Sequence, residues 1–395
     1  MDVMLVTMVF PWPSEAFVGV EVRALAAGGC RLRVRALRSS HPRSRDLLRD
    51  WRLDGLDLTS WSPGSVLRGV AFALRHPWMT LRTVGWLVWH GAARPVLLGR
   101  CLLLLPRMLA VFAECRASPP AVLCLYWGHY PAVLAYLVKR WVPGVHVAMS
   151  LNAYDLVYAF PPSVVMARQV DTLWTITPAN LPAFAALGLD PDRVHVSLHG
   201  IELAQVPVDC SQKVPGEFVT VARLEENKGV DDVIRAFAAV AANHGEARLT
   251  VVGEGPDRPR LESLAREAGV AGRVHFTGGI GHSEVYGLLA RASVLLLLSR
   301  SPAERLPNAV KEAMACRCLC IVTRTPGIEF LLGHLAASMV VEQGDWQAAA
   351  GWLQATLHDP ARFEPDRDAA ATFARENLDA AGSARQRCAI WSGSQ

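Results

Sequence analysis

The stretch Glu304-Arg305-Leu306-Pro307-Asn308-Ala309-Val310-Lys311-Glu312 places two glutamates with seven residues between them. The apolar run 294–298 before it predicts a buried strand, and the residues from Asn308 to Ala315 predict a helix that Asn308 caps. Glu304 then lies in a loop behind a strand, and Glu312 lies near the start of a helix. Such an α/β order of strand, loop and helix is what a Rossmann-like half requires, and the two glutamates suggest a polar pocket.

A basic element, residues 221–229, lies about eighty residues upstream of this stretch. Arg223 offers a planar guanidinium and Lys228 a point charge, and both suit a diphosphate. Glu312 can accept hydrogen bonds from a ribose diol. The free N–H groups at the start of the same helix can hold an anion or sugar hydroxyls, and they belong to Asn308, Ala309 and Val310.

Each of these residues taken singly has a simpler interpretation. Glutamates near helix starts often only complement the helix dipole, and an arginine or lysine in a loop is usually solvated. The complete set, two acids and two cations in this order, favours a nucleotide site over these separate roles.

The same residues resemble the motifs of a known family, the retaining family 4 glycosyltransferases (glycosyl transferases group 1). The segment 304–315 resembles their E-x7-E signature, and Arg223-Leu224 with Lys228-Gly229 resembles their GRL…KG motif. Between them, the run 249–256 resembles their VVGxGP strand and turn, and the run 274–278 their V.F.G strand. The resemblance implies a GT-B fold, in which two Rossmann-like domains face each other across a cleft. It also implies a nucleotide-sugar donor and no cofactor or metal.

The resemblance assigns roles within this site. Arg223 and Lys228 stabilise the departing diphosphate, Glu304 orients the donor sugar and stabilises positive charge at its anomeric carbon, and the three form the catalytic set. Retention then involves attack on the face from which the diphosphate leaves. The implied donor-binding residues are Arg223, Lys228, Gly253, Glu304, Leu306, Pro307, Asn308, Ala309 and Glu312.

The N-terminal half resembles exopolysaccharide enzymes of the colanic-acid type in this family, through the run 13–18 and the run 21–25. A single glycine, Gly19, is expected in a loop between the first strand and a helix from Val20 to Ala27. Glu15 can face an acceptor or can cap a helix or be solvated. The residues expected to face the acceptor or the sugar are Glu15, Gly19, Asn152 and Asp155.

Five positions depart from the family pattern. Two of them, Cys124 and Tyr126, occupy a short strand where relatives often show two histidines. Asn152 stands where relatives carry a histidine; its amide can donate to a hydroxyl but cannot take a proton. Arg305 and Arg317 replace glycines. These changes leave the nucleotide half intact and put the sugar and acceptor half in question.

Residues 64–118 differ in composition from the rest of the chain. They hold seven arginines, three tryptophans and a single acid, Glu114, and their longest uninterrupted apolar run, Met108 to Ala113, is too short to span a bilayer. One interpretation is a basic helical patch on an anionic membrane surface, which would suit a lipid-linked acceptor. The other is a helical insertion packed on the first domain with its arginines in water. Nucleic acid is not expected as a partner, because no recognition motif accompanies the arginines.

Length and composition fit two domains in the cytoplasm. The chain has 395 residues, a net charge of +4 and nine cysteines without a paired framework, which indicates free thiols in a reducing compartment. The run 1–7 predicts a first strand rather than a signal peptide. We expect an N-terminal acceptor-binding domain over 1–200, a nucleotide-sugar-binding domain over 217–367, and a C-terminal helix, about 368–391, that crosses back to the first domain.

The sequence thus predicts a retaining glycosyltransferase that moves a sugar from a nucleoside-diphosphate sugar to a saccharide or lipid-linked acceptor in polysaccharide or glycolipid assembly. Its expected place is the cytoplasm or the inner face of the cytoplasmic membrane. The alternatives are a non-catalytic nucleotide-sugar binder, a nucleotide-sugar epimerase of the same fold, and a structural assembly partner.

Overall fold

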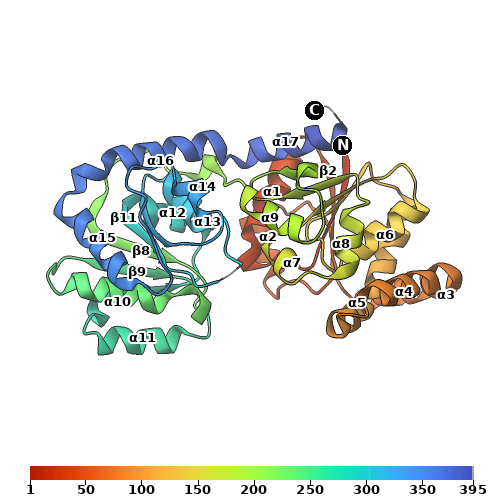
Figure 1. Ribbon diagram of the computed structural model, residues 1–395, viewed down its shortest axis with the longest axis horizontal. Coiled ribbons are helices and arrows are strands. Elements are labelled where there is room, and N and C mark those ends of the chain that lie inside the picture. The colour runs from red at the N-terminus through yellow and green to blue at the C-terminus, as the bar shows by residue number, and fades with distance from the viewer. Residues whose placement is uncertain (302, 394–395) are drawn as a thin grey trace. The chain divides into compact units, whose positions relative to one another are not determined.

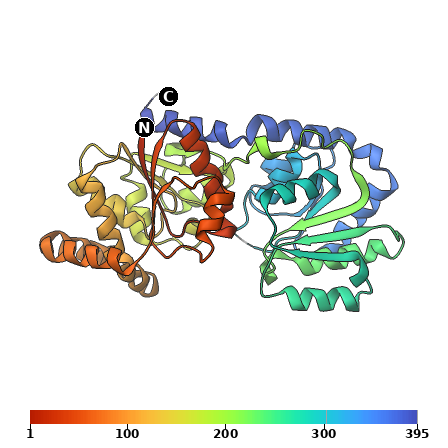
Figure 2. The ribbon, with the colours of Figure 1, turned by 180° about the vertical axis from the view of Figure 1, so that it is seen from behind.

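The computed structural model describes residues 1–301 and 303–393, and these form two compact units. Unit 1 comprises Met1–Gly200 together with Ala380–Gln395, and unit 2 comprises Ile201–Asp379. Each unit is a parallel sheet with helices on its faces (Figure 1; Figure 2). The prediction of an α/β fold with two Rossmann-like sheets is confirmed.

Unit 1 holds a seven-stranded sheet in the order β3-β2-β1-β4-β5-β6-β7, with every neighbouring pair parallel. Its strands are β1 (Asp2–Thr7), β2 (Arg31–Ala36), β3 (Asp57–Thr59), β4 (Val122–Leu125), β5 (His146–Ser150), β6 (Thr172–Thr175) and β7 (Val194–Val196). Two buried apolar clusters pack on the sheet, and its central strands carry residues of both, as parallel strands covered on both faces require.

Ten helices accompany this sheet in the described part of unit 1. They are α1 (Ala16–Ala27), α2 (Ser44–Asp50), α3 (Pro63–Arg75), α4 (Pro77–Gly91), α5 (Pro95–Ala117), α6 (Ala132–Trp141), α7 (Ala153–Val157), α8 (Pro161–Ala167), α9 (Leu181–Ala186) and α17 (Ala380–Ser392). Helix α17 belongs to unit 1 because it packs on α1, although it lies at the end of the chain (Figure 1).

Unit 2 holds a six-stranded sheet in the order β10-β9-β8-β11-β12-β13, again parallel throughout. Its strands are β8 (Val214–Val221), β9 (Arg248–Val252), β10 (Val274–Gly278), β11 (Ala292–Leu297), β12 (Leu319–Thr323) and β13 (Val340–Val341). Its helices are α10 (Val230–Ala241), α11 (Arg258–Glu267), α12 (His282–Arg291), α13 (Asn308–Ala315), α14 (Ile328–Leu332), α15 (Trp346–His358) and α16 (Glu364–Asn377).

Both sheets share one feature that matters for function. Counted from its first strand, each sheet has the order 3-2-1-4-5-6, to which unit 1 adds a seventh strand, so the strand order reverses between the first and fourth strands. Ligands of such folds bind in the crevice at the carboxyl edge of the sheet, beside the loops that leave these two strands. In unit 1 this switch point lies between β1 and β4, and in unit 2 between β8 and β11.

The end of the chain differs from the prediction of a single helix over about 368–391. The structure has two helices instead, α16 and α17, and unit 2 extends through Asp379 rather than ending at 367. The break between the helices is fixed by backbone contacts, since Ile201 N donates to Leu378 O at 2.8 Å and Ile201 forms a bridge with Asp379. The chain therefore leaves unit 2 beside the point where it entered.

Candidate functional site

The switch point of unit 2 brings two loops into direct contact. One loop follows β8 and the other follows β11. Gly229 has a φ of +63°, and a Cβ at this position would lie 1.9 Å from the carbonyl oxygen of Leu298. The N–H of Arg300 donates to the carbonyl of Asn227 at 2.8 Å. Only glycine permits this approach, so the Lys-Gly pair of the sequence sets the distance between the loops.

Lys228 and Glu304 meet where these loops touch. The Nζ atom of Lys228 lies 2.6 Å from Oε2 of Glu304, and the hydroxyl of Ser299 donates to the same oxygen at 3.3 Å. The two side chains are 18% and 16% exposed, so the pair is sheltered but reachable from solvent. An ammonium and a carboxylate thus stand at the crevice in which a ligand of this fold is expected.

Arg223 pairs with a different carboxylate from the one that holds Lys228. Its Nη1 donates to Oε1 of Glu225 at 2.6 Å, and its side chain is 53% exposed. The expected cationic pair is thus divided between two carboxylates, with Arg223 on Glu225 and Lys228 on Glu304. The arginine remains on the same loop as Lys228, five residues away along the chain.

Gly253 holds the next loop against the first. It has a φ of +135°, and a Cβ there would lie 1.9 Å from the carbonyl oxygen of Ala222. Its N–H donates to the carbonyl of Gly278 at 3.0 Å. The structure therefore gives this predicted donor-binding residue a packing role, and its N–H is already used within the sheet edge.

Glu312 lies on α13, and its position corrects the prediction in two respects. Helix α13 begins at Asn308 with Pro307 at the N-cap, and no side chain caps it, so Asn308 is not the cap. Glu312 is the fifth residue of the helix rather than one near its start. The N–H of Val310 donates to the carbonyl of Pro307 at 3.2 Å, which removes it from the N–H groups expected to be free.

A histidine that the sequence did not single out holds Glu312 in place. Nε2 of His282, the first residue of α12, lies 2.8 Å from Oε1 of Glu312, whose side chain is buried. The sequence could have indicated His282 by its position shortly after a strand, because such positions gather at the carboxyl edge of a parallel sheet.

Arg305 and Leu306 are buried in the loop between the glutamates, and Pro307 closes that loop before Asn308 and Ala309 begin α13. Nη1 of Arg305 donates to the carbonyl of Glu304 at 3.0 Å, and burial lowers the pKa of this guanidinium below its ordinary value. At the position where the family resemblance implies a glycine, this chain has a side chain that folds back on its own loop.

An open hollow of about 430 Å³ lies beside Lys228 along the chain, lined by Glu225, Glu226, Asn227 and Arg300. Arg300 is already held by carboxylates, with Nη2 lying 3.0 Å from Asp231. Because the lining is acidic and its cation is neutralised, this hollow does not suit a diphosphate. The pair of Lys228 and Glu304 remains the better candidate.

In unit 1, Glu15 lies near the corresponding switch point. It ends the short helical turn Pro13–Glu15 that follows β1, and it is hydrogen-bonded by Trp127 from the loop after β4. Burial raises the pKa of Glu15 to about 7, partly offset by that bond. Gly19 lies elsewhere: it is inside α1, not in a loop, and a Cβ there would lie 2.6 Å from the Trp51 ring. It is a packing position.

Asn152 and Asp155 lie directly behind β5 and are both buried. The N–H of Asn152 donates to Oδ2 of Asp155 at 3.0 Å, and its amide nitrogen donates to Ser150 at 2.9 Å. Burial raises the pKa of Asp155 to about 7, against backbone N–H bonds, including one from His129, that lower it. Asp155 therefore ties the loops behind β4 and β5 together, and the structure brings it to Asn152 but not into contact with Glu15.

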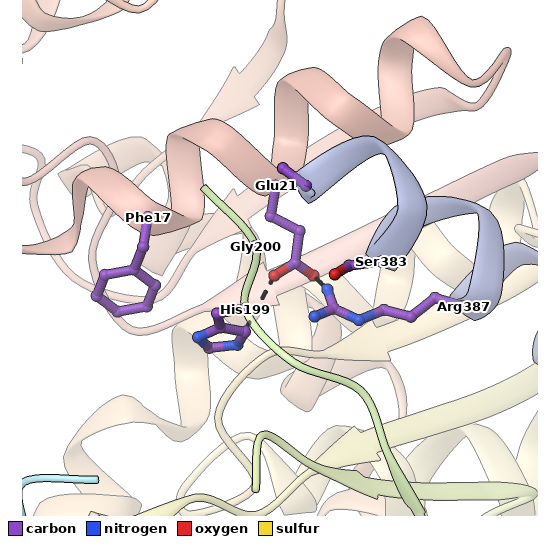
Figure 3. Close-up of a pocket in the computed structure, with 7 residues that line it drawn as sticks. Phe17, Glu21, His199, Gly200, Ser383 and Arg387 are labelled. Atoms are coloured by element: carbon purple, nitrogen blue, oxygen red, sulfur yellow. Dashed lines mark ion pairs between the residues drawn. The ribbon is translucent and has the colours of Figure 1, made fainter. Parts of the chain in front are cut away.

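A second polar cluster in unit 1 was missed at the level of sequence. Glu21 on α1 pairs with Arg387 on α17, and its Oε2 accepts from Tyr126 at 2.8 Å and lies 3.8 Å from Nε2 of His199. Figure 3 shows Glu21, His199 and Arg387 pointing toward one another. The Arg387 guanidinium also lies 4.1 Å from the centroid of the Trp174 ring.

This cluster encloses a cavity of only about 10 Å³, the size of a single water. It therefore anchors a helix rather than holding a ligand. No motif in the sequence marks Arg387, because a buried arginine and an exposed one look alike until the partner carboxylate is placed.

Comparison with known proteins agrees with this fold. Residues 211–377 match the model of a family described as glycosyl transferases group 1. The chain is 29% identical over 219 residues, 53% of each chain, to the protein named for colanic acid biosynthesis, the glycosyltransferase WcaL of Salmonella typhimurium. It is 28% identical over 57% of its length to the lipopolysaccharide core biosynthesis glycosyltransferase LpsD of Rhizobium meliloti, of which it covers 61%.

The chain thus spans little more than half the length of these curated relatives, whereas the similarity to solved structures covers whole chains. HepE of Anabaena, solved in complex with UDP, superposes with a TM-score of 0.74 at 15% identity over 99% of both chains. Sucrose-phosphate synthase of Thermosynechococcus elongatus gives a TM-score of 0.72 at 16% identity, over 100% of this chain and 98% of that one. The fold is of the GT-B type with two Rossmann-like domains, and residues 211–377 carry the region that matches the glycosyl transferases group 1 family.

Proposed function

We propose that this protein is a retaining glycosyltransferase that moves a sugar from a nucleoside-diphosphate sugar to a saccharide or lipid-linked acceptor in polysaccharide or glycolipid assembly. The observation that carries the proposal is the contact between Lys228 and Glu304, 2.6 Å apart at the switch point of unit 2. A cation for a phosphate and a carboxylate for a sugar hydroxyl or a cationic transition state then stand within one donor molecule's reach.

In the proposed reaction, Lys228 leaves Glu304 for the diphosphate of the donor and Arg223 turns from Glu225 to the same group. Both cations gain strength as negative charge develops on the leaving diphosphate. Glu304 then orients the donor sugar and stabilises positive charge at the anomeric carbon. The acceptor attacks on the face from which the diphosphate leaves, and the leaving phosphate takes the acceptor proton.

Glu312 is proposed to accept the ribose hydroxyls. His282 fixes one of its oxygens and leaves the other for the diol. The loop formed by Leu306 and Pro307, together with the backbone at Asn308 and Ala309, is proposed to hold sugar hydroxyls. Gly253 would shape this edge of the sheet rather than bind the donor.

The proposed donor and acceptor classes have support in the similar proteins. HepE is solved with UDP and with UDP-glucose. WcaL and LpsD are named for colanic acid and lipopolysaccharide core biosynthesis. We further propose that the reaction needs no metal or cofactor, and that the protein is cytoplasmic and attaches peripherally to the inner face of the cytoplasmic membrane through residues 64–118. In unit 1, Glu15 is the proposed acceptor-facing acid.

The decisive experiment is a thermal-shift panel of nucleoside-diphosphate sugars on the full chain, followed by a transfer assay with the stabilising donor. One donor should raise the melting temperature. Lys228→Ala should remove that shift and lower turnover by about 10²–10³-fold, the usual effect of losing one charge-stabilising group. Lys139→Ala is the matched control, because Lys139 forms a solvent-accessible ion pair with Asp171 in unit 1.

One observation favours a second candidate, a non-catalytic nucleotide-sugar binder. Arg305 fills the loop in which the family resemblance implies a glycine, and it is bonded to the backbone of Glu304. Donor binding without transfer or hydrolysis would identify such a binder. Conversion of the donor with no acceptor present would instead identify an epimerase.

A further inference from the structure

Helix α3 is apolar on two opposite faces. One face packs on α5, where Gly69 approaches so closely that a Cβ would lie 1.6 Å from the carbonyl oxygen of Pro106. The other face carries Leu67 and Leu74, which are 68% and 77% exposed. Residues 67 and 74 are seven apart and therefore lie above one another on the helix.

Helix α4 repeats this arrangement. Met79 and Leu87 are buried against the unit, whereas Trp78, Leu81 and Trp89 are 73%, 66% and 83% exposed. The exposed positions recur with helical spacing and form a face opposite to the buried one. A helix that is apolar all round is normally covered on every side by protein or by lipid.

The exposed apolar residues are concentrated here. Of the 17 large hydrophobic side chains that are exposed in the described residues, ten lie between Trp61 and Leu103. They are Trp61, Leu67, Val70, Leu74, Trp78, Leu81, Val88, Trp89, Val96 and Leu103. Scattered exposed residues need no explanation, but this concentration indicates an interaction surface.

The charge of this surface is entirely positive. No aspartate or glutamate occurs between Asp57 and Glu114. Both of these acids are bound to Arg35, at 2.9 Å and 2.5 Å, so they do not neutralise the helices. The exposed cations of the surface are Arg68, Arg75, Arg82, Arg94 and Arg100.

Helix α5 decides whether this region lies on a membrane or crosses it. By length and composition it could cross a bilayer, with a mean hydropathy of 1.9 in its most apolar window, of which 39% is buried. The sequence analysis considered only uninterrupted apolar runs and therefore missed that α5 as a whole is long and apolar enough. However, Arg107 in α5 donates to the carbonyls of Ala36 at 3.1 Å and Thr59 at 3.0 Å. These bonds tie α5 to β2 and β3, so it packs as a core helix of unit 1.

We propose that the exposed face of α3 and α4, with the start of α5, is the surface by which this protein lies on an anionic lipid bilayer. Trp78, Trp89, Leu74 and their neighbours enter the headgroup boundary, and the arginines pair with lipid phosphates. An all-cationic rim fits anionic lipid better than a second copy of the same face, because two such faces would repel each other. This inference rests on the proposed peripheral attachment and specifies its surface and its lipid.

The test is co-sedimentation of the full chain with vesicles, compared between phosphatidylcholine alone and phosphatidylcholine with one-third phosphatidylglycerol. We expect binding to the anionic vesicles, weakened by 0.5 M NaCl because salt screens the arginines. Emission from Trp78 and Trp89 should shift to the blue on binding, and the shift should be lost when both are changed to phenylalanine.

Three variants separate the contributions. Trp78→Ser/Trp89→Ser should lower the partition coefficient by about tenfold or more, since both rings lose apolar contact with lipid. Arg75→Gln/Arg82→Gln should lower it by about 25-fold on anionic vesicles only, at roughly fivefold per cation. Val208→Ser/Arg266→Gln is the matched control, because both residues are exposed in unit 2.

Equal binding by the wild type and both surface variants would overturn the proposal. So would a dimer in light scattering that the tryptophan variant dissociates, with no vesicle binding. Nucleotide-induced thermal shifts measured on the same samples keep the two proposals apart. If a surface variant loses vesicle binding but keeps the nucleotide-induced thermal shift, the membrane surface is supported. If the wild type binds vesicles but no nucleotide changes its melting temperature, only the proposed donor site is contradicted.

Discussion

Lys228 and Glu304 form an ion pair with each other, and this pairing has a measurable consequence for donor binding. A diphosphate must draw the ammonium away from a carboxylate at 2.6 Å before it can bind. We predict that Glu304→Gln binds the nucleoside diphosphate at least as tightly as the wild type, because Lys228 is released in advance. Its turnover should nevertheless fall by about 10²-fold or more, since the charge opposite the anomeric carbon is lost.

Calorimetric titration and initial rates measure the two effects separately. A loss of nucleotide affinity in Glu304→Gln equal to the loss of turnover would contradict this view of the pair. Glu225→Gln, which releases Arg223 in the same manner, tests whether the second cation is held in reserve too.

Gly229 gives a prediction about stability. An alanine at position 229 would have a left-handed backbone, and its Cβ would lie 1.9 Å from the carbonyl oxygen of Leu298. Gly269 also has a left-handed backbone, with a φ of +71°, but a Cβ added there would have no atom within 4 Å. Gly269→Ala should therefore cost only the left-handed penalty of roughly 1–2 kcal/mol. Gly229→Ala should cost clearly more, by about 1–3 kcal/mol, because the two loops must separate.

Denaturant unfolding of both variants measures the difference. Equal losses in the free energy of unfolding would show that the loops yield without strain, and the close approach would not then be what fixes Lys228.

Glu15 predicts a dependence of stability on pH. Burial raises its pKa from 4.5 to about 7, so the folded chain holds the proton more tightly than the unfolded chain between these values. The contribution of Glu15 is therefore fully present below about pH 4.5 and is lost as the pH rises through about 7. Glu15→Gln cannot ionise, and its melting temperature should exceed that of the wild type above pH 7 but not near pH 4.5.

Melting curves from pH 4 to pH 8 on both proteins check this. The comparison isolates Glu15, because Asp155, whose pKa is also raised to about 7, is present in both. A difference in melting temperature that does not change with pH would be inconsistent with a buried carboxyl at this position.

At the scale of elements, α17 is held to unit 1 by the buried ion pair between Arg387 and Glu21. Arg387 and Glu21 are 2% and 6% exposed, and burial lowers the pKa of Arg387 to about 9. We predict that Arg387→Met destabilises unit 1 by roughly 3–5 kcal/mol, because the Glu21 carboxylate stays buried without its cation.

Arg385→Met on the exposed side of the same helix should change stability by less than about 0.5 kcal/mol. Adding Glu21→Gln to Arg387→Met should recover part of the loss. If the double variant were as unstable as the sum of the two single changes, the pair would have no coupling and α17 would be held by apolar contacts alone.

At the scale of the whole molecule, the proposed donor should affect the two units unequally. We predict that the nucleoside diphosphate of the stabilising donor lowers amide hydrogen exchange in residues 222–229, 299–301 and 303–312 of unit 2, and at the start of α12, while α3 and α4 exchange as before. Mass spectrometry of peptides from the full chain measures this. Protection confined to unit 1 would place the nucleotide elsewhere, and the Lys228→Ala chain serves as the unprotected reference.

Much of the fold was accessible from the sequence, because strand and helix patterns alternate and parallel strands bring their carboxyl ends together. Lys228 and Glu304, 76 residues apart, were predicted to share a pocket from their residue types and from the family motifs, and they are in contact. The hydrogen-bonding partners of individual side chains could not be predicted from the sequence. Arg223 pairs with Glu225 and Glu312 with His282, and these pairings depend on loop geometry rather than on any periodic pattern. The break between α16 and α17 depends on Ile201, a residue far away in the chain.

The return of α17 to unit 1 bears on how the protein is made. A ribosome releases residues in order, and 179 residues of unit 2 emerge after Gly200 and before Ala380. Until the last segment appears, Glu21 in the nascent first unit lacks its guanidinium, while unit 2 already has every residue it needs. Unit 2 is therefore expected to reach its native form on the ribosome and unit 1 only after termination of translation. A chain that ends even a dozen residues early would keep nearly all of its sequence, yet its first unit would lack Arg387 and most of α17.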